Sequence, residues 1–176
     1  MKLCMFSPKE PFLDRGWPGR IDGETVIQLA AQTLQSFFTG GGQAREHAEY
    51  PLADVVFRAP VLHPPSVRIF DEAGDFAFAN PAAIKAIDEE PGGPGSEGVE
   101  RVAAIVGADG AIGGFTPLVE WVAPQLQGAK QRDFALTLGP VVSTPDEGVP
   151  LGVDWERLVA HAAENTALFP GDLIVR

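Results

Sequence analysis

Residues 97–147 have the sequence EGVERVAAIVGADGAIGGFTPLVEWVAPQLQGAKQRDFALTLGPVVSTPDE. The first part predicts a β-hairpin, because Val99 and residues 102–106 are small or β-branched, as in a strand buried inside a sheet. Asp109-Gly110 supplies the turn, where glycine takes a positive φ without strain. Residues 112–116 begin the return strand. We expect Pro117 to mark a strand end or an edge, since proline cannot donate to a sheet ladder.

The remaining chain predicts further short strands and few helices. Residues 136–138 and 141–143 form a second strand pair, broken by Gly139-Pro140. Near the N-terminus we expect a strand at residues 2–6 and a hairpin at residues 20–27. Other expectations follow from periodicity and composition. They are a helix over 25–38, a short helix over 45–49, a strand at 55–57, a mobile surface loop over 86–98, and an amphipathic helix over 154–164 with Asp154 as its N-cap.

Composition narrows the class of protein. The chain has 176 residues and is 45% hydrophobic, which supports one domain with a real core, or one domain with a small appendage. Its net charge of −11 argues against nucleic-acid binding and against binding to anionic membranes. No apolar run approaches the roughly 20 residues of a membrane helix. Cys4 is the only cysteine, which favours a reducing, cytoplasmic compartment.

Four segments, in this order along the chain, carry a resemblance to a known family. They are similar to the motifs NPAAI, GYTxxNDW, AKxxDF…LGP and LxPGDxI of the fumarylacetoacetate hydrolase family, which comprises enolic diketo-acid hydrolases, decarboxylases and isomerases. The segments are NPAAI at 80–84, GFTPLVEW at 114–121, AKQRDFALTLGP at 129–140 and LFPGDLI at 168–174. The resemblance implies an α+β, mainly β fold: a mixed β-roll or sandwich with few helices. We expect residues 1–50 to form a small N-terminal β unit plus a helix, and residues 51–176 to form a trimmed core domain.

The resemblance also indicates where a metal would be held. Active members bind Mg²⁺ or Mn²⁺ through carboxylates, the oxygen ligands that such hard cations prefer. Aligned with the family, the ligand positions of this chain fall on Ile69, Val99, Arg101 and Glu120. Because only Glu120 is acidic, we expect no metal and no other cofactor here.

Other functional positions of the family are shortened or retained. In typical members roughly forty residues, which carry a catalytic His, precede the NPAAI motif. Here only residues 71–79 separate Phe70 from that motif. Lys130 is retained, and in the family this Lys contacts the substrate. The resemblance therefore implies Lys130 and Glu120 as candidate catalytic residues, and Arg101 and Lys130 as candidate substrate-binding residues.

Two hypotheses about function follow. The first is a degenerate member of the fold that lacks metal-dependent hydrolase activity and serves as a structural, regulatory or binding subunit, because fold alone does not determine function. The alternative is a residual hydrolase, isomerase or decarboxylase acting on a small keto or enol acid, with Arg101 binding a substrate carboxylate in place of the metal. In that site Arg101 is expected to pair with Glu120. The expected partner is a second copy of the chain or a full-length homologue.

Overall fold

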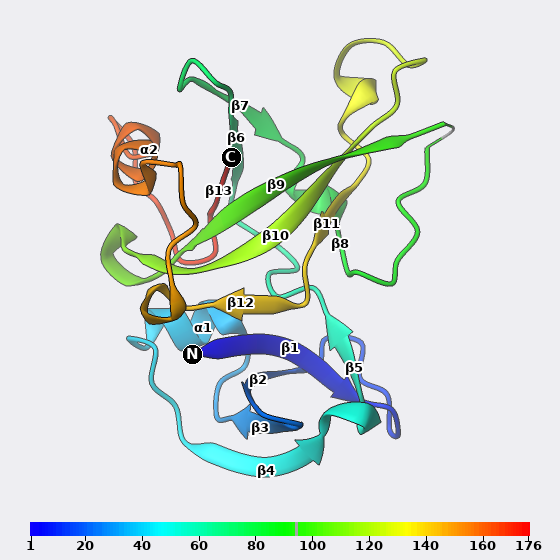
Figure 1. Cartoon of the computed structure of the whole chain (residues 1–176), viewed down its shortest axis with the longest axis vertical. Coiled ribbons are helices and arrows are strands. Elements are labelled where there is room, and N and C mark those ends of the chain that lie inside the picture. Colours follow the sequence, from blue (N-terminus) through cyan, green and yellow to red (C-terminus); the bar gives the residue numbers. More distant parts are fainter. Residues whose placement is uncertain (94) are drawn as a thin grey trace.

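Strands are the main regular structure of the chain. The computed structural model describes residues 1–93 and 95–176. Within this part thirteen strands join in one hydrogen-bonded sheet and the two α-helices are short, so the predicted mainly β, α+β class is confirmed (Figure 1). The strands are β1 (Lys2–Pro8), β2 (Trp17–Asp22), β3 (Thr25–Leu29), β4 (Glu46–Pro51), β5 (Val55–Arg58), β6 (Val67–Phe70), β7 (Phe76–Ala79), β8 (Ile84–Lys85), β9 (Glu97–Val106), β10 (Ile112–Val122), β11 (Leu136–Leu138), β12 (Val141–Ser143) and β13 (Leu173–Val175). The helices are α1 (Leu34–Thr39) and α2 (Trp155–Ala162).

The hairpin of β9 and β10 is the longest strand pair and crosses the middle of the upper half of the molecule (Figure 1). The two strands pair antiparallel from their outer ends, Glu97 opposite Val122, to the turn. At the turn Asp109 has a φ of 54° and Gly110 a φ of 75°. Gly110 takes this left-handed conformation freely, and Asp is one of the few other residues that tolerate it. The predicted hairpin is confirmed.

The expectation that Pro117 marks a strand end or an edge is wrong. Strand β10 continues through Pro117 to Val122. Pro117 lies opposite Val102, whose backbone N–H and C=O both bond Arg176, so no donor is needed from the proline on that side. On its other side β10 passes from β12 to β11 at this point, and Pro117 accepts a bond of 2.8 Å from the N–H of Gly139. A proline is therefore accommodated where the neighbouring strand is interrupted.

The N-terminal half contains one confirmed hairpin and two wrong helix predictions. Strands β2 and β3 form the predicted hairpin. The helix expected over 25–38 is wrong in its first half, because α1 begins only at Leu34, where the Thr33 side chain accepts from the N–H of Ser36. The helix expected over 45–49 is wrong as well, since these residues enter β4, an edge strand paired with β3. In both places strand pairing overrides the local pattern of apolar residues.

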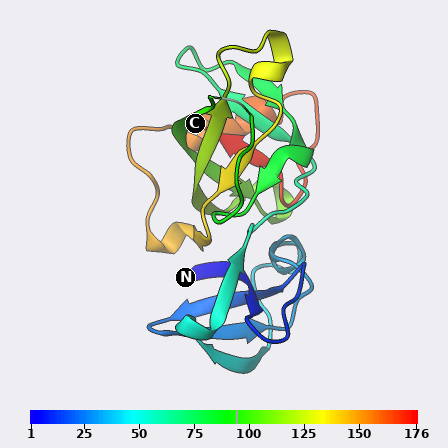
Figure 2. The ribbon, with the colours of Figure 1, turned by 90° about the vertical axis from the view of Figure 1, so that its right-hand side faces the viewer.

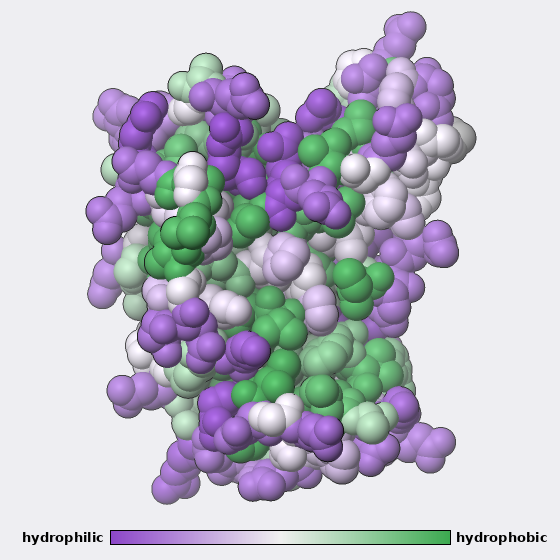
Figure 3. All heavy atoms as spheres, viewed as in Figure 1, coloured by the Kyte–Doolittle hydropathy of each residue, from purple (hydrophilic) through white to green (hydrophobic). Residues whose placement is uncertain are grey.

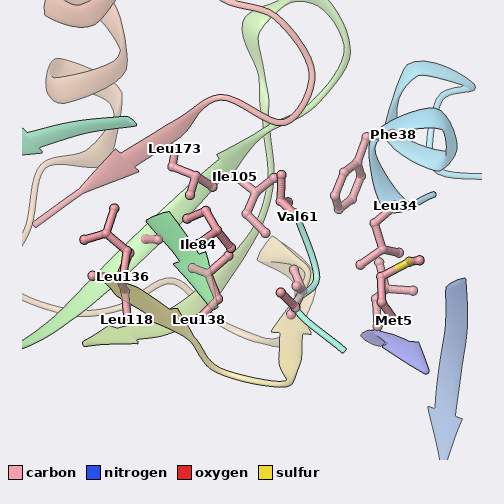
Figure 4. Close-up of a cluster of buried hydrophobic side chains, with 14 of the residues drawn as sticks. Met5, Leu34, Phe38, Val61, Ile84, Ile105, Leu118, Leu136, Leu138 and Leu173 are labelled. Carbon is pink, nitrogen blue, oxygen red and sulfur yellow. The ribbon is translucent and has the colours of Figure 1, made fainter. Parts of the chain in front are cut away.

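One of the hydrophobic clusters is shared by the two lobes. Figure 2 shows the N-terminal strands as a lower lobe beneath the remainder of the chain. Strand β1 links them, because it pairs with β2 and β5 on the lower side and with β12 on the upper side. The largest buried cluster extends across the junction, from Met5, Leu34 and Phe38 to Ile105 and Leu173 (Figure 4). Burial of this cluster is what fixes the two lobes against each other.

The C-terminal elements match their predictions closely. Strands β11 and β12 span the predicted residues, separated by Gly139-Pro140. Helix α2 forms where expected, and the Asp154 side chain accepts from the N–H of Arg157 at 3.1 Å, as an N-cap does. Residues 86–93 and 95–96 connect β8 to β9 without regular structure, and Pro94 of this predicted loop lies outside the described residues.

Candidate functional site

An open cavity of about 410 Å³ lies in the upper part of the molecule. One wall is the β6–β7 hairpin, the floor is the outer half of the β9–β10 hairpin, and the opposite wall follows the 3₁₀ turn at Gly128–Gln131. Figure 3 shows the corresponding notch between two raised parts of the surface. Three elements far apart in sequence therefore enclose one space.

Glu120, on the floor of the cavity, is the only buried carboxylate among the described lining residues. Glu120 and Val99 are directly opposite each other on β10 and β9, and Arg101 is two residues along β9, so all three side chains leave the same face of the hairpin. Arg101 Nε donates to Glu120 Oε2 at 2.8 Å. The Glu120 side chain is 2% exposed and that of Arg101 is 19% exposed. The expected pairing of Arg101 with Glu120 is confirmed.

A second arginine, Arg132, completes the group, and no sequence pattern singles it out. Arg132 Nη1 donates to the other carboxylate oxygen, Glu120 Oε1, at 2.8 Å. Its side chain is 55% exposed and reaches the cavity from the opposite wall. Arg132 stands at a variable position between Lys130 and Asp133 in the AKxxDF segment, so neither spacing nor motif marks it. We call Arg101, Glu120 and Arg132 the arginine–glutamate triad.

The four positions that align with the metal ligands of the family lie in or beside this cavity. Ile69, Arg101 and Glu120 line it, and Val99 faces Glu120 across the hairpin. The residues present do not suit a divalent cation, because both oxygens of Glu120 already accept from guanidinium groups and the remaining positions are apolar or basic. No group of three or more His, Cys, Asp or Glu side chains in residues 1–93 and 95–176 is arranged to hold a metal ion.

Lys130 lies beside the cavity rather than among its lining residues. Its side chain is 76% exposed, and Nζ pairs with Asp133 Oδ2 at 2.7 Å. Asp133 does line the cavity, and its backbone carbonyl accepts from Nδ2 of Asn80 at 2.9 Å. The structure thus brings Arg101 and Glu120 together but leaves Lys130 at the rim. The bond from Asn80 ties the NPAAI segment to the turn that carries Arg132.

The β6–β7 wall is short and firmly anchored. Residues 71–75, which stand where the family resemblance implies a long lid, form a tight turn in which Asp71 accepts from the N–H groups of Gly74 and Asp75. Below this turn the guanidinium of buried Arg68 lies against the rings of Phe76 and Phe78. The aromatic side chains of this hairpin therefore pack on the side away from Glu120, and the side toward Glu120 carries Ile69 and Ala77.

A polar network fixes β6 against the C-terminal strand. Ser66 Oγ donates to Asp172 Oδ1 at 2.6 Å, and the N–H of Phe169 donates to Asp172 Oδ2 at 2.7 Å. Arg68 Nη1 lies 3.9 Å from the same carboxylate, and both side chains are almost fully buried. The Asp of the LFPGDLI segment thus has a structural role in pairing β13 with β6.

Comparison with solved structures identifies the architecture. The chain superposes on a maleylpyruvate hydrolase from Sphingobium sp. SYK-6 with a TM-score of 0.79 at 18% identity, covering 99% of this chain and 87% of that one. It matches a 2-keto-3-deoxy-D-arabinonate dehydratase complexed with magnesium and 2,5-dioxopentanoate with a TM-score of 0.72 at 14% identity, over 99% and 86% of the two chains. The chain has the fumarylacetoacetate hydrolase fold. The fold implied by the four motifs is therefore confirmed.

Other neighbours carry different activities on this fold. A 2-hydroxyhepta-2,4-diene-1,7-dioate isomerase from Mycobacterium marinum matches with a TM-score of 0.67 at 20% identity, covering 99% of this chain and 86% of that one. No protein-family model and no curated protein matches the sequence. Since hydrolase, dehydratase and isomerase share the fumarylacetoacetate hydrolase fold, the fold does not select among their reactions.

Proposed function

We propose that this chain is a binding protein built on the fumarylacetoacetate hydrolase fold, and that it does not perform divalent-metal-dependent hydrolysis. The arginine–glutamate triad carries this proposal. Arg101 occupies a position where the family resemblance implies a carboxylate ligand, and its Nε bonds the only acid retained among the four positions. A guanidinium at that place repels a divalent cation and occupies the oxygen that would coordinate it.

Among its described lining residues the cavity also lacks a free buried general base, which such hydrolysis requires in addition to a metal. A bound metal polarises a carbonyl or activates a water, and a general base must lie within hydrogen-bond reach of the proton it takes. The three histidines of the chain are absent from the lining of the cavity. Glu120 is held by two arginines, so its lone pairs are engaged in ion pairs.

An activity assay tests the proposal. We expect hydrolysis of acylpyruvates by the purified chain, with Mg²⁺ or Mn²⁺ supplied, to remain at the background rate. A metal-dependent hydrolase of the same fold assayed beside it would show that the substrate and the conditions are adequate. Metal-dependent turnover that is lost in Glu120→Ala would contradict the proposal.

One observation favours a second function, a residual enzyme for small keto or enol acids. The cavity is open and retains Arg101 and Glu120 together, and one neighbour is a maleylpyruvate hydrolase in complex with manganese (II) ion and pyruvate. Turnover of a keto or enol acid without added metal, abolished by Glu120→Ala, would support this alternative. Binding without turnover would support the first proposal.

We also propose that the chain pairs with a second copy of itself. Leu151 is 97% exposed and follows Val149 and Pro150. Val149 lines an apolar hollow of about 470 Å³ and its neighbour of about 370 Å³, and Pro150 lines the smaller one. The larger hollow is lined in part by Phe115 and Trp155. A projecting leucine beside an apolar hollow is self-complementary, as a two-fold contact between identical chains requires.

We propose a cytoplasmic location, which the cysteine content supports. Cys4 is the only cysteine in the sequence, so no internal disulfide contributes to stability. In the part of the chain that the structure describes, no helix is long and apolar enough to span a membrane.

A further inference from the structure

The arginine–glutamate triad has more hydrogen-bond donors than acceptors. A guanidinium carries five N–H groups. Among the described residues Arg101 uses only Nε and Arg132 only Nη1 in side-chain hydrogen bonds, and both bonds go to Glu120. Two cationic side chains against one carboxylate leave the triad with a net charge of +1.

The spare donors face the cavity. Arg101 and Arg132 both line it, from the floor and from the wall beside the Gly128–Gln131 turn. The Arg101 side chain is 19% exposed, and neither of its Nη atoms is both fully buried and unpaired, so these nitrogens are open to the cavity. A guanidinium with open N–H groups favours an oxyanion, because hydrogen bonds between charged partners are stronger than those between neutral groups.

The other wall restricts what the remainder of a ligand can be. Asp71 and Asp75 line the cavity on the β6–β7 hairpin, so a second negative charge on the ligand would be repelled there. Asp133 is already paired with Lys130. The side chains of Ile69, Ala77 and Ala79 make up the rest of that wall, whereas Phe76 and Phe78 alternate with them and lie on the other face of the hairpin, toward Arg68 and α2. The space suits a short, uncharged body attached to one carboxylate.

We propose that this cavity binds a small monocarboxylate without a metal ion, with the carboxylate held between the free nitrogens of Arg101 and Arg132. The inference rests on the proposed function, since it takes the arginines to stand in place of a cation. Glu120 then serves as the positioning residue that fixes both guanidinium groups. Arg132 is the side chain that reaches the ligand most freely, because it is half exposed and held at one nitrogen.

Calorimetric titration with pyruvate in the presence of EDTA tests the proposal. We expect saturable binding by the wild-type chain, weakening as salt is added. Arg132→Gln should weaken binding by roughly tenfold to a hundredfold, the equivalent of one or two charge-assisted hydrogen bonds. Arg132→Lys should lie between the two, because it keeps the charge but loses the planar fork.

The matched control is Arg45→Gln, which removes the same charge from an exposed arginine that lines no described cavity. This control should bind pyruvate as the wild type does. Succinate should bind more weakly than pyruvate, because its second carboxylate meets Asp71 and Asp75. Thermal unfolding of each variant checks that the fold is retained.

Pyruvate binding with and without Mn²⁺ distinguishes a failure of the carboxylate site from a failure of the proposed metal-free function. Absence of pyruvate binding, or equal losses in Arg132→Gln and Arg45→Gln, would overturn the carboxylate site and leave the proposal of a metal-free protein standing. Pyruvate binding that appears only with added Mn²⁺ would overturn both. Tighter binding of succinate than of pyruvate would contradict the assignment of a monocarboxylate.

Discussion

Glu120 is the residue on which the cavity depends. Its side chain is 2% exposed, and it sits between two guanidinium groups, each within 2.8 Å. A buried carboxylate is costly unless it is paired and hydrogen-bonded, and here both oxygens are. The same pairing keeps Arg101, which is mostly buried, from being an uncompensated charge.

Glu120→Ala should therefore lower the free energy of unfolding by about 3 kcal/mol, the low end for breaking a buried ion pair, since Arg101 keeps some access to water. Removing the carboxylate also leaves two cations facing each other. Urea unfolding monitored by circular dichroism measures the change. The double variant Arg101→Met with Glu120→Gln should cost less than Glu120→Ala alone, because the buried charges leave together. A loss below about 1 kcal/mol for Glu120→Ala would indicate an exposed pair of the weak surface type.

Two residues of the triad, Arg101 and Glu120, could be predicted from the sequence, and Arg132 could not. Alternation along a strand was sufficient to place Val99 and Arg101 on one face, since side chains two apart in a strand share a side. That Glu120 faces them was implied by the family resemblance and not by spacing. Arg132 could not be found in this way, because it comes from a loop whose path depends on tertiary packing. Lys130, two residues away, points outward and pairs with Asp133 for the same reason.

At the scale of elements, prediction succeeded where local signals are strong. Turn residues and β-branched runs gave β9, β10, β11 and β12, and a capping Asp gave the start of α2. It failed at β4 and in the first part of residues 25–38, where strands are recruited by pairing with neighbours rather than by their own composition. Pro117 was misjudged because the break between β11 and β12 that accommodates it is a tertiary feature.

Strand β1 joins the two lobes, and the reactivity of its Cys4 thiol measures whether this strand opens. The thiol is fully buried between β2 and β12, and this burial raises its pKa to about 12 from an ordinary value of 9.0. We expect negligible reaction with a thiol reagent at pH 8 in native buffer, and full reaction in urea, because both the thiolate and access are missing in the folded state.

The raised pKa also has a consequence for stability. The folded state holds the protonated thiol more firmly than the unfolded state does. The contribution of Cys4 to the free energy of unfolding is therefore fully present below about pH 9 and is lost as pH rises toward the folded pKa.

Complete labelling of Cys4 within minutes in native buffer at pH 8 would show that β1 opens readily, which would contradict its place inside the continuous sheet.

At the scale of the whole molecule, the proposed two-fold contact depends on Leu151. Replacing this leucine with Asp should convert a dimer into a monomer, because a charge would have to enter the apolar hollow of the other copy. Light scattering coupled to gel filtration measures the mass. Ile87→Asp is the control, since Ile87 is 55% exposed and does not line either hollow near Leu151. A monomeric wild type, or a dimer unaffected by Leu151→Asp, would refute the contact; a complex formed only with a full-length homologue would replace the second copy as partner.

Where the family resemblance implies a divalent metal, we propose that the arginine–glutamate triad stands instead. Calorimetric titration with Mn²⁺ tests this substitution, with the double variant Val99→Glu/Arg101→Glu as the comparison, because it places two acids on the face of the β9–β10 hairpin that carries Glu120. We expect the wild type to bind Mn²⁺ no better than millimolar, and the folded double variant to bind it at least tenfold more tightly. A stoichiometric, micromolar Mn²⁺ site in the wild-type chain would contradict this expectation.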